Sequence, residues 1–149
     1  MRRQVSVGIE SWPLERPFRI SRGVKTAADV VVVELNDGQH VGRGECVPYP
    51  RYGESVDSVA AQIRSVVASL EQGASRIDCR QLLPSGAALN AIDCALWDLE
   101  ARASGRAVDQ LLGLARPTTL TTALTVGLDT PEQMGWVTAQ MSSAPVIKV

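Results

Sequence analysis

Apolar residues recur at steps of three and four through residues 84–105, PSGAALNAIDCALWDLEARASG. This spacing predicts a helix with one face in a core. We expect Ser85 to cap its start by accepting a backbone N–H, and Gly105 to take the left-handed conformation after its end. The predicted apolar arc comprises Ala88, Ala91, Ile92, Ala95, Leu96, Leu99 and Ala103. The opposite face places a large indole beside small polar groups, at Asn90, Asp93 and Trp97. This mixture indicates that a second element also packs against the helix.

The N-terminal third of the chain has the pattern of strands. Apolar and polar residues alternate over residues 4–14, which predicts a half-buried strand that ends at a proline. Residues 29–35, DVVVVEL, are rich in β-branched side chains and predict a second strand, which the tight turn at residues 36–38 connects to a third over residues 41–47. We therefore expect three antiparallel strands. Residues 16–25 carry four positive charges without a clear period and predict a mobile loop.

Two further helices are predicted around the long one. The first begins at the cap Ser55 and ends just before Gly73. Its apolar stripe comprises Val59, Ile63, Val66, Val67 and Leu70. A short helix follows over residues 108–112, which Gly113 and then Pro117 terminate.

The last thirty or so residues predict a βαβ unit. Residues 120–126 read as a strand, and Thr130 caps a helix that reaches about residue 141, with Gln133 able to bond back to the cap. Residues 145–149 begin another strand, which the crossover makes parallel to the first. Parallel sheets are nearly always covered on both faces, and one helix cannot do this. We therefore expect this chain to be the first part of a longer protein.

Composition restricts the classes of function. Of 149 residues, 45% are hydrophobic and 21% charged, and 15 basic against 16 acidic residues give a net charge of −1. These values fit a soluble globular protein without the basic patch of a nucleic-acid or membrane-surface protein. No apolar run is long enough to span a bilayer, and no signal-type region follows the first residues.

The histidine and cysteine residues give little sign of metal or thiol chemistry. Three cysteines, Cys46, Cys79 and Cys94, lack a zinc-type spacing, which favours spare thiols in a reducing cytoplasm. The single histidine, His40, falls in a predicted turn, where we expect an exposed side chain without a catalytic role.

Several motifs together resemble the enolase superfamily, in its muconate-cycloisomerase branch and closest to the dipeptide epimerases. The motifs are ISRG at 20–23, VGRGECVPYPRYGES at 41–55, LPSGAALNAIDCALWDLEARASG at 83–105, TTALTV at 121–126 and IKV at 147–149. The resemblance covers essentially the whole chain. It implies an α+β capping domain, with a three-stranded antiparallel sheet plus helices, over residues 1–117. The first β/α unit of a truncated (β/α)₈ barrel would follow over residues 118–149.

The resemblance implies Mg²⁺-assisted removal of a proton next to a carboxylate. The ion stabilises the enediolate, and bases on opposite faces remove and return the proton. One base belongs to a Lys-x-Lys pair at the end of the second barrel strand, where residues i and i+2 share a face and lower each other's pKa. Lys148 matches the first lysine of this pair, and the second would be position 150. An ordinary strand lysine is the competing interpretation.

The same resemblance implies four substrate-binding residues. Thr125 matches a threonine that contacts substrate near the end of the first barrel strand, and a threonine placed there for its β propensity is the alternative. Arg22 and Lys25 are candidates for binding the far carboxylate of an alanyl-glutamate-type dipeptide, with solvated surface charge as the alternative. Tyr52, in the second of two loops that close over the substrate, either lines the pocket or packs its own loop.

No metal ligand can be assigned in this sequence. The carboxylates of the central helix, Asp93, Asp98 and Glu100, receive no metal role, and Asp98 and Arg102 have the spacing of a helix salt bridge. We expect the ligands and the opposite base to lie beyond the chain, which alone should neither bind Mg²⁺ strongly nor turn over substrate. The full-length form is expected to be a cytoplasmic homo-oligomer without nucleic-acid or membrane partners. A cycloisomerase, an o-succinylbenzoate-synthase-like enzyme and a non-catalytic interaction module remain alternatives.

Overall fold

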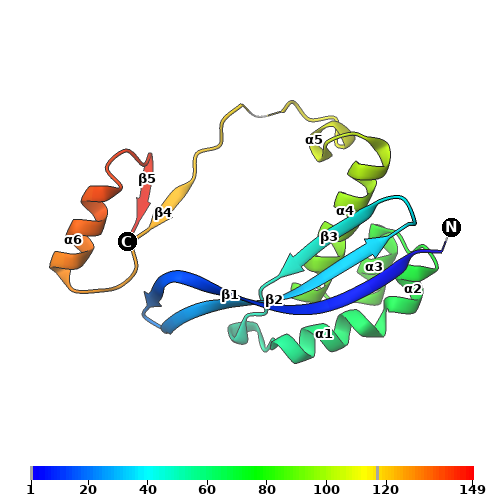
Figure 1. Ribbon diagram of the computed structural model, residues 1–149, viewed down its shortest axis with the longest axis horizontal. Coiled ribbons are helices and arrows are strands. Elements are labelled where there is room, and N and C mark those ends of the chain that lie inside the picture. The colour runs from blue at the N-terminus through cyan, green and yellow to red at the C-terminus, as the bar shows by residue number, and fades with distance from the viewer. Residues whose placement is uncertain (1, 117) are drawn as a thin grey trace. The chain divides into compact units, whose positions relative to one another are not determined.

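The computed structural model describes residues 2–116 and 118–149, so the predicted terminator Pro117 lies outside the described residues. The chain divides into two compact units. Unit 1 contains the residues up to Trp12 together with Asp29–Ala115, and unit 2 contains Pro13–Ala28 together with Arg116–Val149. The predicted domain boundary after residue 117 stays a prediction. Figure 1 shows the order of the elements within each unit.

A three-stranded sheet is the base of unit 1. Its strands are β1 (Gln4–Ile20), β2 (Gly23–Asn36) and β3 (Val41–Cys46), in the order β1-β2-β3. β2 and β3 pair antiparallel, with Val33 opposite Gly44. The turn between them forms because the Asp37 carboxylate accepts the backbone N–H groups of Gln39 and His40, at 2.8 and 2.7 Å. The three-stranded antiparallel sheet is thus confirmed.

The predicted mobile loop at residues 16–25 is wrong. These residues continue β1 and β2 as a hairpin whose ends meet at a two-residue turn, Ser21 and Arg22. We call residues 13–28, the part of this hairpin that belongs to unit 2, the arm. Most side chains of the arm are exposed, so neither of its faces required apolar residues. The period-two signal that identifies a half-buried strand is therefore missing from the sequence.

Helices cover one face of the sheet in unit 1. In chain order they are the 3₁₀ turn η1 (Pro50–Tyr52), α1 (Val56–Ser65), α2 (Val67–Glu71), α3 (Arg76–Leu82), α4 (Ala87–Ser104) and α5 (Val108–Leu111). The single helix expected from Ser55 to Gly73 is broken at Val66, where φ is −109° and ψ is 3°. Ser55 does cap α1 as predicted. η1 and α3 were not predicted.

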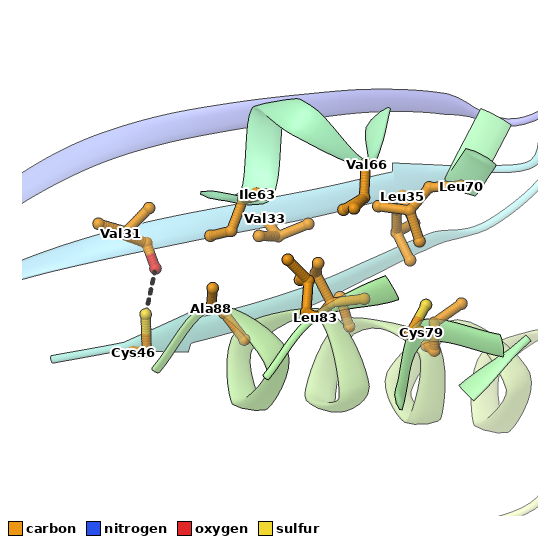
Figure 2. Close-up of a cluster of buried hydrophobic side chains, with 14 of the residues drawn as sticks. Val31, Val33, Leu35, Cys46, Ile63, Val66, Leu70, Cys79, Leu83 and Ala88 are labelled. Atoms are coloured by element: carbon orange, nitrogen blue, oxygen red, sulfur yellow. Dashed lines mark hydrogen bonds between the residues drawn. The ribbon is translucent and has the colours of Figure 1, made fainter. Parts of the chain in front are cut away.

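The core lies between this sheet face and the helices. Figure 2 shows side chains of β2 (Val31, Val33 and Leu35) gathered with those of α1, α2 and the residue between them (Ile63, Leu70 and Val66) and with Cys79, Leu83 and Ala88. The apolar stripe predicted for the helix that begins after Ser55 is buried except at Val67, which is half-buried. Burial of so many Val, Leu and Ile side chains is the main stabilising contribution, about 25 cal/mol for each Å² removed from water.

The long helix α4 organises this core as predicted, with two corrections. Its buried face contains every predicted residue but one, since Ala103 is exposed. The helix begins at Ala87, and its N-cap is Gly86 and not Ser85. Gly105 takes the left-handed conformation at φ +64°, as expected.

The expected second partner of α4 is α3. The guanidinium of Arg76 lies over the Trp97 ring, with Cζ 3.1 Å from the ring centroid. Its Nη2 also pairs with Glu100 at 3.2 Å. The side chains of α4 that face away from β3 therefore contact a second helix, which explains the indole on the polar face.

Unit 2 contains the predicted βαβ unit, formed by β4 (Ala123–Thr125), α6 (Pro131–Gln140) and β5 (Val146–Lys148). β4 and β5 are parallel, as expected for a helical crossover. Thr130 caps α6 by accepting the Gln133 N–H at 3.3 Å. The Thr130 N–H donates to Asp129 Oδ1 at 2.8 Å. Asp129 therefore accepts the hydrogen bond from the cap residue that Gln133 was expected to accept.

Candidate functional site

The parallel pair in unit 2 brings two of the predicted site residues together. Thr125 of β4 and Lys148 of β5 are partners in the strand register, at the carboxyl ends of both strands. Neighbouring residues in register lie on the same face of a sheet, so the hydroxyl and the ammonium group share one face. The Val126 N–H donates to the Lys148 carbonyl at 2.9 Å, which fixes the pairing just beyond Thr125. Both side chains are exposed to solvent.

A pocket of about 790 Å³ lies beside Thr125 in unit 2. The arm forms one wall, and α6 with the segment after β4 forms the rest. Its charged lining residues are of both signs, and Phe18, Met134 and Trp136 supply apolar surface. The charged residues are Glu15, Arg16, Arg19 and Asp129. Such a lining suits a small ligand that has both charged and apolar parts.

The arm is attached to the segment after β4 through the main chain. The Leu128 N–H donates to the Arg19 carbonyl at 2.9 Å. Gly127 lies next to the same stretch, and a Cβ placed on it would be 3.6 Å from the Arg19 carbonyl oxygen. The arm is therefore held against the carboxyl end of the first strand of the βαβ unit. Sequence reasoning missed this contact, because it joins two main-chain groups that no side-chain pattern marks.

Arg22 and Lys25, the two candidates for binding the far carboxylate, both lie on the arm. Arg22 is in the turn and Lys25 is near the start of β2, and both are exposed. The turn is followed by Gly23 at φ +141°, a conformation that side-chain-bearing residues rarely adopt. The hairpin thus presents two cations near its tip, and neither lines the pocket beside Thr125.

Tyr52 belongs to unit 1, in the segment between β3 and α1. Its side chain is 75% exposed, and its ring centroid is 5.8 Å from that of Tyr49. Gly53 follows at φ +73° and turns the chain back. The next residue, Glu54, accepts hydrogen bonds from the Tyr49 N–H at 3.1 Å and from the Ala87 N–H at 2.7 Å. Sequence analysis gave Glu54 no role, although it is the carboxylate within the PYPRYGES motif.

The residues that the structure describes do not fit a magnesium site. Among them there is no group of three or more His, Cys, Asp or Glu side chains that could hold a metal ion. Two carboxylates of α4 already have partners: Asp98 accepts the Arg43 N–H and the Arg102 Nε, each at 2.9 Å, and Glu100 pairs with Arg76. The predicted Asp98–Arg102 salt bridge is confirmed.

The cysteines are free thiols, with Cys46 and Cys79 buried and Cys94 exposed. Burial raises the pKa of Cys46 to about 11, and the thiol donates weakly to the Val31 carbonyl at 3.8 Å (Figure 2). A buried thiol with a raised pKa is a poor nucleophile. Within residues 2–116 and 118–149, the helices are too short or too polar to cross a membrane.

Comparisons with known proteins agree with the motifs. The mandelate racemase/muconate lactonizing enzyme N-terminal domain matches residues 2–113. The L-Ala-D/L-Glu epimerase of Escherichia coli K12 is 54% identical over 132 residues, which are 89% of this chain and 41% of that enzyme.

Solved structures show the same fold. An enolase family member from Agrobacterium tumefaciens, with homology to dipeptide epimerases and with bound sodium and L-Ala-L-Glu, is 43% identical at a TM-score of 0.91. The alignment covers 99% of this chain and 46% of that one. The dipeptide epimerase of Cytophaga hutchinsonii, in complex with Mg and D-Ala-L-Val, is 27% identical at a TM-score of 0.83, over 100% and 44% of the two chains.

The chain thus spans less than half the length of these relatives. The family match covers its N-terminal three quarters, and the structural likeness extends through the βαβ unit. The prediction of the superfamily is confirmed. The chain belongs to the mandelate racemase/muconate lactonizing enzyme family of the enolase superfamily, among relatives that are dipeptide epimerases.

Proposed function

We propose that the whole protein containing this segment epimerises dipeptides of the alanyl-glutamate type by removing and returning the α-proton. The observation that carries the proposal is the placement of Thr125 beside Lys148 at the carboxyl ends of two parallel strands. In β/α barrels the active site is built at this end of the strands. The 54% identity to an L-Ala-D/L-Glu epimerase favours an acidic dipeptide over other carboxylate substrates.

Lys148 would contact the substrate carboxylate and assist the base. When the α-proton leaves, negative charge moves onto that carboxylate, and a cation held nearby stabilises the developing charge more than it stabilises the ground state. Thr125, next to Lys148 in the register, would hold the same end of the dipeptide through its hydroxyl. Return of a proton on the opposite face inverts the stereocentre, and the groups needed for that step would come from outside residues 1–149.

The cofactor proposed for the whole protein is Mg²⁺, as in the Cytophaga hutchinsonii complex. A divalent ion supplies charge stabilisation to a carboxylate that becomes an enediolate. Because the described residues do not fit such a site, this chain's contribution would be substrate contact, specificity and exclusion of water.

Specificity would come from the arm and from the segment that contains Tyr52. Arg22 or Lys25 would pair with the side-chain carboxylate of the substrate, since both cations are exposed near the tip of the arm. A charged pair of this kind discriminates strongly against a substrate that lacks the carboxylate, because the cation would be left without its partner. Tyr52, exposed over most of its surface, would also cover the dipeptide.

The test is exchange of the α-proton in D₂O, followed by proton NMR. The whole protein with Mg²⁺ should exchange the glutamyl α-proton of L-Ala-L-Glu, and Lys148→Ala should slow this exchange by about 100-fold, the lower end for loss of one group that stabilises the developing charge. Arg22→Ala and Lys25→Ala, made separately, should show which cation binds the substrate: that variant loses activity on L-Ala-L-Glu and keeps its activity on L-Ala-L-Ala. A wild-type protein that exchanges no member of a dipeptide panel would refute the epimerase assignment.

Two finer properties belong to the same proposal. The whole protein would be a homo-oligomer, which sedimentation of that protein measures. It would act in the cytoplasm, in keeping with free thiols at Cys46, Cys79 and Cys94. A cycloisomerase or succinylbenzoate synthase would instead convert its own substrate without α-proton exchange of any dipeptide.

A further inference from the structure

Glu54 joins two segments of unit 1 that are distant in the sequence. One carboxylate oxygen, Oε1, accepts the Ala87 N–H at 2.7 Å, at the first residue of α4. The other oxygen, Oε2, accepts the Tyr49 N–H at 3.1 Å, at the start of the segment that contains Tyr52. Both bonds are made to a carboxylate and are therefore stronger than bonds between neutral groups. We call residues 49–53 the 49–53 loop. A single side chain thus connects this loop to the central helix α4.

The start of α4 needs this carboxylate because its own residues do not cap it. The N-cap, Gly86, has no side chain to accept a hydrogen bond, and the first turn reads Ala-Ala-Leu-Asn without an acidic residue. An uncapped helix start leaves backbone N–H groups without partners and a partial positive charge. Glu54 supplies both an acceptor and a negative charge there. Gly86 leaves room for it, since an added Cβ would lie 3.0 Å from Glu54 Oε1.

The 49–53 loop closes on the same carboxylate. Inside the loop, the Tyr52 N–H bonds to the Tyr49 carbonyl at 2.9 Å, and the Gly53 N–H bonds to the Pro50 carbonyl at 3.0 Å. Gly53, in the left-handed conformation, turns the chain so that Glu54 points back at Tyr49. The loop is therefore a closed turn, and the Glu54 carboxylate is the point at which it is attached to α4.

We propose that Glu54 is a positioning residue for substrate recognition, which acts by holding the 49–53 loop and the Tyr52 ring in place. The proposal rests on the proposed function, in which Tyr52 covers the bound dipeptide. Tyr52 itself is exposed, and its ring lies against that of Tyr49, inside the same loop. Glu54 links this loop directly to the first residue of α4. If this link is broken, the loop must be ordered again each time substrate binds, and affinity falls.

A neighbouring residue offers a matched control. Ser55 caps α1 by accepting the Ser58 N–H at 3.1 Å, so Ser55→Ala removes a helix cap one position away without touching the Glu54 bonds. Glu54→Ala removes both bonds, and Glu54→Gln keeps the shape but retains only one acceptor oxygen for two N–H groups. A purely structural role would make the Ser55 and Glu54 variants behave alike.

The experiment measures KM and kcat for L-Ala-L-Glu in the whole protein. Glu54→Ala should raise KM about tenfold, which corresponds to about 1.4 kcal/mol, with kcat changed by less than about twofold. Glu54→Gln should give a smaller rise, and Ser55→Ala should leave KM unchanged. Tyr52→Ala should raise KM as well, and adding Glu54→Ala to it should have little further effect, because the two residues act through one loop. An unchanged KM in Glu54→Ala, or an equal rise in Ser55→Ala, would overturn the proposal.

Amide hydrogen exchange gives a second measurement that does not depend on activity. Glu54→Ala should speed exchange in the peptides that contain Tyr49 and Ala87, and Ser55→Ala should speed it only in α1. If the wild-type protein acts on no dipeptide, the proposed function fails, and this measurement decides alone. Faster exchange in both peptides then supports the attachment of the loop by Glu54, and unchanged exchange overturns it.

Discussion

Gly42 and Gly44 allow β3 to lie directly against α4. A Cβ added to Gly44 would clash with the Ala91 carbonyl oxygen and would lie 2.5 Å from the Ala95 nitrogen. On Gly42 it would clash with the Ala95 carbonyl oxygen and lie 2.5 Å from Leu99 Cβ. These are mostly backbone atoms, which cannot rotate away. The two glycines of the GRGE sequence at residues 42–45 therefore allow the strand and the helix to approach each other closely.

Substitution of Gly44 by alanine should destabilise the fold. We expect Gly44→Ala to lower the free energy of unfolding by about 1–3 kcal/mol or more, the usual cost of overpacking a core. Gly8→Ala in β1 is the control, since nothing lies within 4 Å of a Cβ at that position. Urea unfolding followed by circular dichroism measures both. Equal stability of the two variants would show that β3 and α4 are not in this close contact.

Capping explains why one helix was missed and another was predicted to begin at the wrong residue. At α3, Ser75 Oγ accepts the Asp78 N–H at 3.3 Å, and Asp78 Oδ2 accepts the Ser75 N–H at 2.8 Å. The Ser75 backbone N–H lowers the pKa of Asp78, which keeps the carboxylate charged. This capping box was readable as S-x-x-D, but the helix it begins has only seven residues and little periodicity. The cap of α4 comes from Glu54, far away in the sequence, so Ser85 was only the nearest plausible residue.

Two serine substitutions separate the predicted cap from the observed one. Ser75→Ala should lower the free energy of unfolding by about 1 kcal/mol, the typical cost of losing an N-cap. Ser85→Ala should change it by less than about 0.5 kcal/mol, because Ser85 is exposed and is not the N-cap of α4. Thermal and urea unfolding of both variants test this pair. A larger effect at Ser85 than at Ser75 would contradict the capping described for both helices.

An element was predictable where it has a periodic buried face, as α4 does, or clear cap residues, as α6 does at Thr130 and Pro131. The apolar stripe of α4 identifies that helix, since this side lies in the core, and the tight turn after β2 identifies β3 as its partner strand. The arm has no buried face, so its sequence lacks the alternation that would predict its strands. The sequence pattern also does not show the break at Val66. Ile63, Val66 and Leu70 are all buried, so the apolar spacing of a single helix continues through the break. At the site, the parallel pairing of β4 and β5 was predictable, but the register that makes Thr125 and Lys148 partners comes from the structure. The pocket wall and the role of Glu54 depend on long-range main-chain bonds, which periodicity does not encode.

At the scale of the whole chain, unit 2 exposes much apolar surface. Trp136 of α6 is 56% exposed, and Leu120 and Val149 are each 82% exposed. Within the described part of this unit, the parallel sheet consists of two strands, and strand edges of this kind can pair with other chains. A surface of this kind favours association with other chains.

The isolated 149-residue chain should therefore self-associate. Sedimentation velocity should show species larger than a monomer that grow with concentration. Trp136→Glu should reduce this association, whereas Ile77→Glu, at a residue of α3 that is 72% exposed, should leave it unchanged. A stable monomer at all concentrations, or equal effects of the two variants, would show that the apolar surface of unit 2 does not cause association.

The bond from Leu128 to Arg19 matters for anyone who recombines relatives of this chain. A crossover placed in the linker after α5 would exchange the capping sheet and its helices as a block. The arm would travel with that block, although its main-chain partner would remain in the other parent. Chimaeras designed at that position would therefore combine an arm from one parent with residues 125–129 from the other. The arm and residues 125–129 are better exchanged together.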